Sequence, residues 1–189
     1  MKDQIRALGI DDAPFKRYNK RTFLIGTMMK SKYYVEGISI KNIAIDGLDS
    51  TKKILDMING KFSKQIRVIF LNGITFGGFN IVNVENLFKK TGIPVITITR
   101  KNPDFQKIEN ALKKYFDDHE YRFSLMTRYD MNRIDFVNYT VYSQIVGIGF
   151  EEAKNIIERF TLRGNIPEPI RISHMIGSAL KFGFSKGKP

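Results

Sequence analysis

The sequence predicts an α/β protein in which helices cover a mixed β-sheet. Three apolar, β-rich segments come first, at residues 5–10, 21–29 and 33–45, and the short link at 30–32 suits an antiparallel hairpin. Helix-like and strand-like segments then alternate, which is the order expected of a layered sheet with parallel strands. We expect a single domain, 1–189, because no repeat, low-complexity tract or Pro/Gly/Ser-rich linker divides the chain.

Local residue patterns predict the individual elements. Residues 49–60 are expected to be helical, since Asp49 or Ser50 can cap the N-terminus and Gly60 can end the helix. Residues 66–71 are almost entirely apolar, as in a central strand that is covered on both faces. The remaining expected elements are helices at 81–92, 102–116 (N-cap Asn102), 150–164 (ending at Gly164) and 173–183 (N-cap Ser173), strands at 93–99 and 137–148, and an extended proline-containing segment at 167–172.

The charge balance of the chain favours an anionic partner. Lysine and arginine number 31 against 19 aspartates and glutamates, which gives a formal net charge of +12. Such a surplus is typical of proteins that bind DNA or RNA. The absence of cysteine excludes a disulfide framework, a thiolate nucleophile and a cysteine-based zinc site. We expect a cytoplasmic protein with no membrane partner, because no apolar run reaches the length of a membrane span and no secretory signal begins the chain.

Polar residues follow the ends of the predicted strands. Asp11 and Asp12 end the first strand, Asn72 ends the central strand, and residues 99–101 follow the next one. In open sheets of this type, binding sites form at the carboxyl ends of the strands. Because side chains alternate along a strand, Asp12 is expected to face away from Asp11.

The stretch after Asn72 contains three glycines and could approach a ligand closely with its backbone. Within it, an aromatic ring could stack on a nucleobase, although a core position is the competing interpretation. Basic residues along the chain could follow a phosphate backbone. The residues expected to contact nucleic acid are Lys16, Arg17, Phe76, Asn80, Arg100, Lys101 and Arg171.

Four segments resemble the archaeal DUF99 (UPF0215) family, which is related to endonuclease V. They are GIDDAPF, IDGLDSTKKILDMI, IFLNGITFGGFNIVNVENLFKKTGIPVITITRKNPD and PEPIRISHMIGSALKFG, and they follow one another over nearly the whole chain. The resemblance implies a ribonuclease-H-like fold with a mixed five-stranded sheet, in which three antiparallel strands are followed by alternating helices and strands.

The resemblance to endonuclease V also implies a site for Mg²⁺ or Mn²⁺. Asp11 matches the aspartate of the first strand, and either Asp46 or Asp49 matches the acidic residue before the first helix. Asn72 matches the aspartate that ends the fourth strand. The DUF99 family usually has Leu-Asp-Gly at this place, so the asparagine departs from the pattern and removes a negative charge from the site.

The segment PEPIRISHMI resembles the late strand-to-helix stretch that supplies a further polar residue to the endonuclease V site. Ser173 or His174 would take that role. Asp46 and Asp49 also have ordinary structural interpretations, as a turn residue and a helix cap respectively.

Three functions are consistent with these residues. In a nuclease, the catalytic residues would be Asp11, Asp46, Asp49, Asn72 and His174, of which Asp11, Asp49 and Asn72 would hold the metal ion. Metal-bound water would attack phosphorus without a covalent protein intermediate. A nucleic-acid-binding protein without catalysis would keep the basic groove and lack the metal site, and Asn72 favours it. A protein-interaction scaffold with incidental charge is the third alternative.

Overall fold

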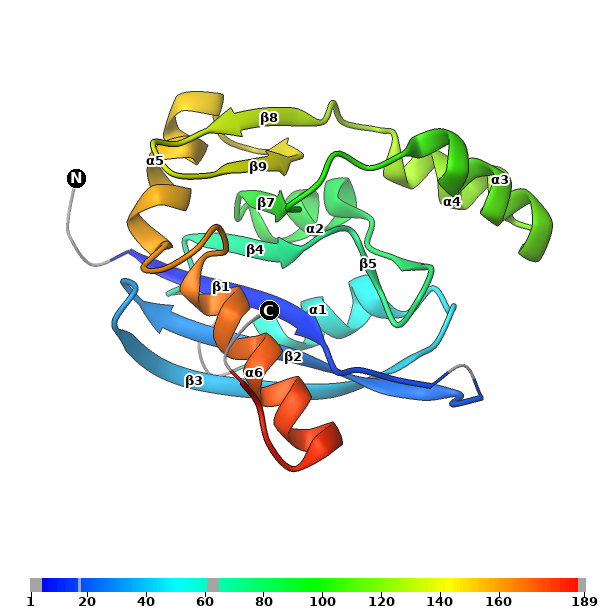
Figure 1. Ribbon diagram of the computed structural model, residues 1–189, viewed down its shortest axis with the longest axis horizontal. Coiled ribbons are helices and arrows are strands. Elements are labelled where there is room, and N and C mark those ends of the chain that lie inside the picture. The colour runs from blue at the N-terminus through cyan, green and yellow to red at the C-terminus, as the bar shows by residue number, and fades with distance from the viewer. Residues whose placement is uncertain (1–4, 17, 61–64, 187–189) are drawn as a thin grey trace.

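The computed structural model describes residues 5–16, 18–60 and 65–186 (Figure 1). Its central sheet has the strand order β10-β7-β4-β1-β2-β3. These strands are β1 (Arg6–Asp12), β2 (Arg21–Lys30), β3 (Tyr34–Ala44), β4 (Val68–Asn72), β7 (Val95–Ile98) and β10 (Ile145–Val146). The first three strands are antiparallel, whereas β1, β4 and β7 run parallel. The predicted order is therefore confirmed, but the sheet has six strands rather than five because β10 pairs antiparallel with β7.

Four further strands form two small ribbons outside the main sheet. They are β5 (Thr75–Phe76) with β6 (Asn80–Ile81), and β8 (Asn132–Asp135) with β9 (Thr140–Ser143). The strand predicted at 137–148 is thus divided between β9 and β10. The division falls at Gln144, whose backbone N–H donates to the Thr97 hydroxyl at 2.8 Å instead of to a carbonyl of a neighbouring strand.

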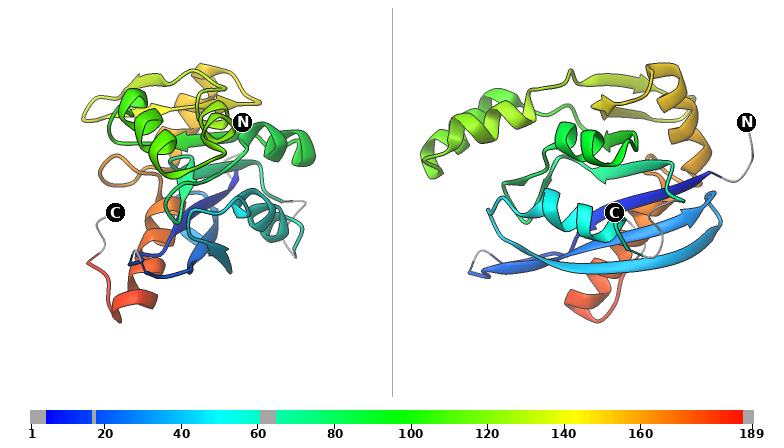
Figure 2. Two further views of the ribbon diagram at one scale, coloured as in Figure 1. Left: turned by 90° about the vertical axis from the view of Figure 1, so that its right-hand side faces the viewer. Right: turned by 180° about the vertical axis from the view of Figure 1, so that it is seen from behind.

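Helices cover both faces of the sheet (Figures 1 and 2). Within the described residues they are α1 (Ser50–Ile58), α2 (Val84–Thr91), α3 (Phe105–Tyr115), α4 (His119–Met126), α5 (Phe150–Phe160) and α6 (Glu168–Phe182). Side chains of β4 alternate between two apolar clusters: Ile69 and Leu71 pack with α1, α2 and α4, whereas Val68 and Phe70 pack with α5 and the start of α6. None of these helices is long and apolar enough to cross a membrane.

The beginning of α6 differs from the prediction. The helix starts at Glu168 rather than at Ser173, with Pro167 as its N-cap, so the segment expected to be extended is largely helical. Pro169 lies in the first turn, where a missing backbone N–H costs no helical hydrogen bond. The two prolines therefore begin the helix instead of preventing it.

As a result, Ser173 lies inside α6 and faces the sheet. The Ser173 hydroxyl lies 2.9 Å from the Gly9 carbonyl and 2.8 Å from the Thr27 hydroxyl. It can donate its single hydrogen to either oxygen. A Cβ atom on Gly9 would overlap with the backbone of Pro169. Only glycine at this position allows α6 to lie directly against β1.

Other helix ends also differ from the prediction: α1 ends at Ile58 rather than at Gly60, and α2 begins at Val84 rather than at residue 81. The same holds for α3 and α5. The N-cap of α3 is Asp104, whose carboxylate accepts the Lys107 N–H at 3.1 Å, rather than Asn102. Helix α5 ends at Phe160 rather than at Gly164, because Thr161 is extended and its hydroxyl donates to the Ile157 carbonyl at 2.8 Å. These differences shift only the helix ends and leave the order of elements unchanged.

Candidate functional site

Strands β1 and β4 bring Asp11 and Asn72 to the same edge of the sheet. The strands are parallel neighbours in which Ile10 pairs with Leu71, so the two residues that follow also lie side by side. The Asn72 amide nitrogen donates to Asp11 Oδ1 at 2.9 Å. Because Asp11 is only 3% exposed, its carboxylate depends on such hydrogen bonds.

Helix α6 adds His174 to this pair. Its Nδ1 lies 2.9 Å from Asp11 Oδ2, so both oxygens of the carboxylate are engaged. The hydrogen bond to Asp11 raises the pKa of His174 above its ordinary value, while burial and the positive charge of Arg100 oppose the rise. With Nδ1 directed to the carboxylate, Nε2 is the ring nitrogen left to exchange a proton with a ligand. We refer to Asp11, Asn72 and His174 as the Asp11 cluster.

Asp12 faces away from the Asp11 cluster toward the glycine turn at residues 75–80. Its Oδ2 accepts the Gly77 N–H at 2.7 Å. Burial raises the pKa of Asp12 to about 6, the Gly77 hydrogen bond acts in the opposite direction, and the charge of Asp11 adds to the rise. Gly77 and Gly78 both have positive φ, at 54° and 85°, which explains why glycines stand here. Asp12 therefore fixes the glycine turn beside the Asp11 cluster.

Asp46 contacts the same glycine turn. Its Oδ1 accepts the Phe79 N–H at 2.7 Å, and its own N–H donates to the Gly77 carbonyl at 2.8 Å. Asp46 is exposed and has a positive φ of 56°, which aspartate tolerates better than most residues. The structure thus places Asp46 on the glycine turn, where its carboxylate is bound to backbone rather than to the Asp11 cluster.

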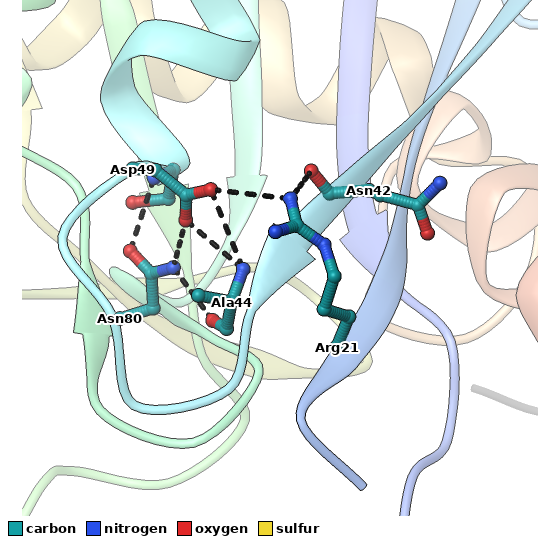
Figure 3. Close-up of polar contacts among 6 residues, drawn as sticks. Arg21, Asn42, Ala44, Asp49 and Asn80 are labelled. Carbon is teal, nitrogen blue, oxygen red and sulfur yellow. Dashed lines mark hydrogen bonds and ion pairs between the residues drawn. The ribbon is translucent and has the colours of Figure 1, made fainter.

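Asp49 lies in a different set of contacts (Figure 3). Its Oδ1 accepts hydrogen bonds from the Ala44 N–H at 3.1 Å and the Asn80 amide at 2.7 Å, and its Oδ2 lies 3.8 Å from the Arg21 guanidinium. Asn80 is fully buried, donates to the Ala44 carbonyl at 2.8 Å and accepts the Ser50 N–H at 3.0 Å. We call this arrangement the Asp49–Asn80 clasp. It connects the end of β3, the start of α1 and β6.

The predicted metal ligands Asp11, Asp49 and Asn72 do not converge in this arrangement. Asp49 belongs to the clasp, and Asn72 directs its amide nitrogen, not its oxygen, toward Asp11. Across the described part of the chain, no three histidine, aspartate or glutamate side chains are grouped so that they could hold a metal ion. Mg²⁺ and Mn²⁺ need several oxygen ligands around one point, so these donors do not fit such an ion.

Three of the residues predicted to contact nucleic acid are placed at the surface. Arg100 follows β7 and lies close enough to His174 for its charge to lower the pKa of the imidazole. Lys16 and Lys101 are also exposed. These cations would be accessible to a phosphate backbone.

The other predicted contacts are occupied within the protein or lie outside the described residues. Arg171 makes hydrogen bonds of 2.6–2.9 Å to the buried carboxylate of Glu168, which compensates its charge. Phe76 is 1% exposed and packs in the apolar core, in agreement with the competing interpretation of this ring. Asn80 is bound in the clasp, so neither residue presents its side chain to a base. Arg17 lies outside the described residues.

Sequence reasoning missed Arg122, whose guanidinium reaches the glycine turn from α4. The side chain is buried and donates to the Phe79 carbonyl at 2.6 Å. The only signal in the sequence is the spacing of Asp118 and Arg122, four residues apart on a helix. That spacing usually indicates an exposed ion pair, so it does not predict that Arg122 is buried.

Comparison with solved structures identifies the fold. Endonuclease V of Ciona intestinalis, in complex with a 24mer DNA that contains an inosine, has a TM-score of 0.59 at 12% identity, covering 90% of this chain and 82% of that one. A protein of unknown function from Archaeoglobus fulgidus has a TM-score of 0.84 at 35% identity, covering 94% and 98% respectively. The fold is ribonuclease-H-like and similar to that of endonuclease V, as predicted.

The chain belongs to the Endonuclease dU family, whose model matches residues 3–181. A UPF0215 protein of Pyrococcus horikoshii is 42% identical over 188 residues, which are 98% of this chain and 97% of that protein. A UPF0215 protein of Methanocaldococcus jannaschii is 43% identical over 178 residues, with 94% and 95% covered. The family predicted from the four sequence segments is therefore confirmed.

Proposed function

We propose that the protein is an endonuclease that hydrolyses a phosphodiester bond of nucleic acid at the Asp11 cluster. The observation that carries this proposal is the hydrogen bond between Asp11 and His174 at the carboxyl end of β1. It occurs in a chain of the Endonuclease dU family, and this name makes deoxyuridine in DNA the first substrate to test. The cytoplasm stays the predicted compartment.

In this mechanism, His174 transfers the proton. Asp11 orients the imidazole through Nδ1 and favours its charged form, while Asn72 holds the other carboxylate oxygen in place. Nε2 of the neutral imidazole accepts a proton from the attacking water, whose oxygen forms the new bond to phosphorus, and Asp11 stabilises the imidazolium that results. The bond from phosphorus to the leaving oxygen breaks, that oxygen takes up a proton from solvent water, and Nε2 then releases its proton to solvent.

Positive charge would bind the substrate and stabilise the transition state. Arg100 is the cation whose charge acts on His174, so it would lie near the phosphate that reacts. Lys16 and Lys101 would contact phosphates further along the strand. DNA and RNA both carry this backbone, and these contacts do not distinguish them.

A requirement for Mg²⁺ or Mn²⁺, which the resemblance to endonuclease V implies, has no support from the positions of the donors. Asp49 is held in the clasp, and both oxygens of Asp11 accept hydrogen bonds from N–H groups. No step of the proposed mechanism therefore depends on a metal ion, and the assay measures the requirement directly.

A second function is binding of DNA or RNA without cleavage. The observation that favours it is the hydrogen bond from Asn72 to Asp11, because a neutral amide stands where the resemblance to endonuclease V implies an aspartate. A protein of this kind would keep the surface cations and the fold but would have lost the catalytic metal site.

One experiment distinguishes these functions. Labelled single-stranded and double-stranded oligonucleotides, with deoxyuridine, deoxyinosine or neither, are incubated with the protein in Mg²⁺, Mn²⁺ or EDTA. Cleavage that is lost in His174→Gln and Asp11→Asn supports the nuclease, and His119→Gln, the other histidine of the chain, is the matched control. Binding without cleavage, with activity gained only in Asn72→Asp, supports the second function. Failure to bind at low salt overturns both.

A further inference from the structure

Arg122 makes a set of contacts that the proposed mechanism does not use. It is 5% exposed, and its Nε donates to Asp118 Oδ1 at 2.7 Å. Its Nη1 donates to the Gly47 carbonyl at 3.0 Å and to the Phe79 carbonyl at 2.6 Å. The guanidinium also lies over the ring of Phe116, 4.4 Å from its centroid.

These contacts compensate the cost of burying a cation. An unpaired buried charge is strongly unfavourable, and breaking a buried ion pair leaves such a charge behind. Here one carboxylate, two carbonyls and one aromatic face surround the guanidinium. Lysine has no planar fork of donors and could not reproduce this pattern.

Arg122 joins two loops that come from different parts of the chain. Gly47 belongs to the turn that carries Asp46, and Phe79 belongs to the glycine turn. Figures 1 and 2 show α4 at the end of the molecule toward which β1 and β4 run. A single side chain from α4 therefore bonds both loops at this end, in addition to the direct hydrogen bonds that Asp46 makes to the glycine turn.

A continuous set of hydrogen bonds leads from these loops to Asp12, the chain neighbour of Asp11. Asp46 accepts the Phe79 N–H at 2.7 Å and donates its own N–H to the Gly77 carbonyl at 2.8 Å. Gly77 in turn donates to Asp12 at 2.7 Å, and Asp12 is the chain neighbour of Asp11. Movement of the loops relative to each other would change this last hydrogen bond beside the cluster.

We infer that Arg122 is a positioning residue, which holds the glycine turn at the distance from β1 that nucleic-acid binding at the Asp11 cluster requires. The effect of Arg122 on nucleic-acid binding rests on the proposed function, whereas its effect on the position of the glycine turn is a property of the free protein. Arg122 contacts neither the Asp11 cluster nor the surface cations directly, so it acts through the loops.

The test compares Arg122→Lys with the native protein by NMR. We expect Arg122→Lys to fold, and its Gly77 and Phe79 amides to lose protection from hydrogen exchange by at least about tenfold. The Kd or KM for a deoxyuridine-containing oligonucleotide should rise by about tenfold, and kcat should change less. Asp118→Asn leaves the guanidinium in place and should cause a smaller change in the same direction, which keeps the test valid if Arg122→Lys does not fold.

Arg128→Lys is the matched control. Arg128 is exposed, follows the same helix and is ion-paired to Glu85 at 2.7 Å, so its substitution should leave the Gly77 amide and the binding unchanged. Unchanged protection of Gly77 in folded Arg122→Lys overturns the inference. Loss of protection without any change in binding overturns the link to the substrate, and absence of nucleic-acid binding by the native protein contradicts only the proposed function.

Discussion

Asn72 gives Asp11 a hydrogen-bond donor where an aspartate would place a second negative charge. Asn72→Asp should therefore lower the melting temperature in EDTA, since two carboxylates would lie about 3 Å apart, at a cost of about 1–3 kcal/mol. Added Mn²⁺ should raise the melting temperature of this variant more than that of the native protein. Calorimetry with and without Mn²⁺ measures both effects.

Asn42→Asp, at an exposed asparagine of β3, controls for unspecific binding of Mn²⁺ to an added carboxylate. An equal gain in the native protein would show that the amide of Asn72 does not limit metal binding.

Asp12 provides a prediction about pH. Its pKa of about 6 in the folded protein lies above the ordinary value of 3.8, so the folded state binds the proton more tightly than the unfolded chain. Stability therefore falls as pH rises from about 4 to about 6 and stays lowered above that range. Asp12→Asn keeps an oxygen for the Gly77 N–H and should be more stable than the native protein near pH 7, by up to about 3 kcal/mol, but not near pH 4.

Urea unfolding at the two pH values measures this difference. Asp56→Asn, at an exposed position of α1, should change the free energy of unfolding little at either pH. A variant at Asp12 that is equally destabilised at both pH values would contradict the predicted cost of ionisation.

At the scale of elements, the position of α6 decides whether the site exists. Gly9→Ala would place a Cβ into the backbone of Pro169, so α6 must move away from β1 and carry His174 with it. We expect a loss of stability of at least about 3 kcal/mol and disruption of the hydrogen bond to Asp11, measured by chemical denaturation and by the imidazole resonances of His174. Gly149→Ala is the control, because a Cβ there meets nothing within 4 Å. Equal effects of the two substitutions would contradict the close packing of α6.

The strands that carry Asp11 and Asn72 could be predicted from the sequence because their apolar runs are short, uninterrupted and followed by polar residues. The start of α6 could not, since proline disfavours a helical residue before it in most contexts yet is well accepted in the first turn. Local sequence rules are therefore consistent with either an extended or a helical segment at 167–172. In the folded protein the segment is helical and packs against β1.

The candidate site was only partly predictable for a related reason. The pairing of Asp11 with Asn72 follows from two adjacent parallel strands, which the order of elements predicts. The separate placement of Asp46 and Asp49 depends on Asn80 and on the glycine turn, which approach them only in the folded chain. An aspartate at position 46 or 49 can bind a metal ion or accept hydrogen bonds within the protein, and the residue type alone does not distinguish these roles.

For the whole molecule, the net charge of +12 predicts binding that depends strongly on salt. The binding constant for single-stranded DNA should fall at least about tenfold between roughly 50 and 200 mM salt, because each contacted phosphate releases counterions. Fluorescence anisotropy across a salt series measures the slope of log K against log salt. Arg100→Ala should reduce this slope by about one.

Lys113→Ala is the matched control for the slope. Lys113 lies on α3 and is ion-paired to Glu109 at 2.6 Å, so its loss should leave the slope unchanged. A binding constant that does not respond to salt would contradict a phosphate-tracking surface and favour the interaction scaffold.

His174 follows Asp11 by 163 residues, and the two meet only when α6 packs against β1. During translation, Asp11 and Asn72 are made first, and at about 5–20 residues per second the imidazole arrives roughly 8 to 30 s after Asp11. A nascent chain would therefore expose its acidic strand end before it has the imidazole that transfers the proton in the proposed mechanism. The proposed activity would begin only after the ribosome has released the helix that completes the candidate site.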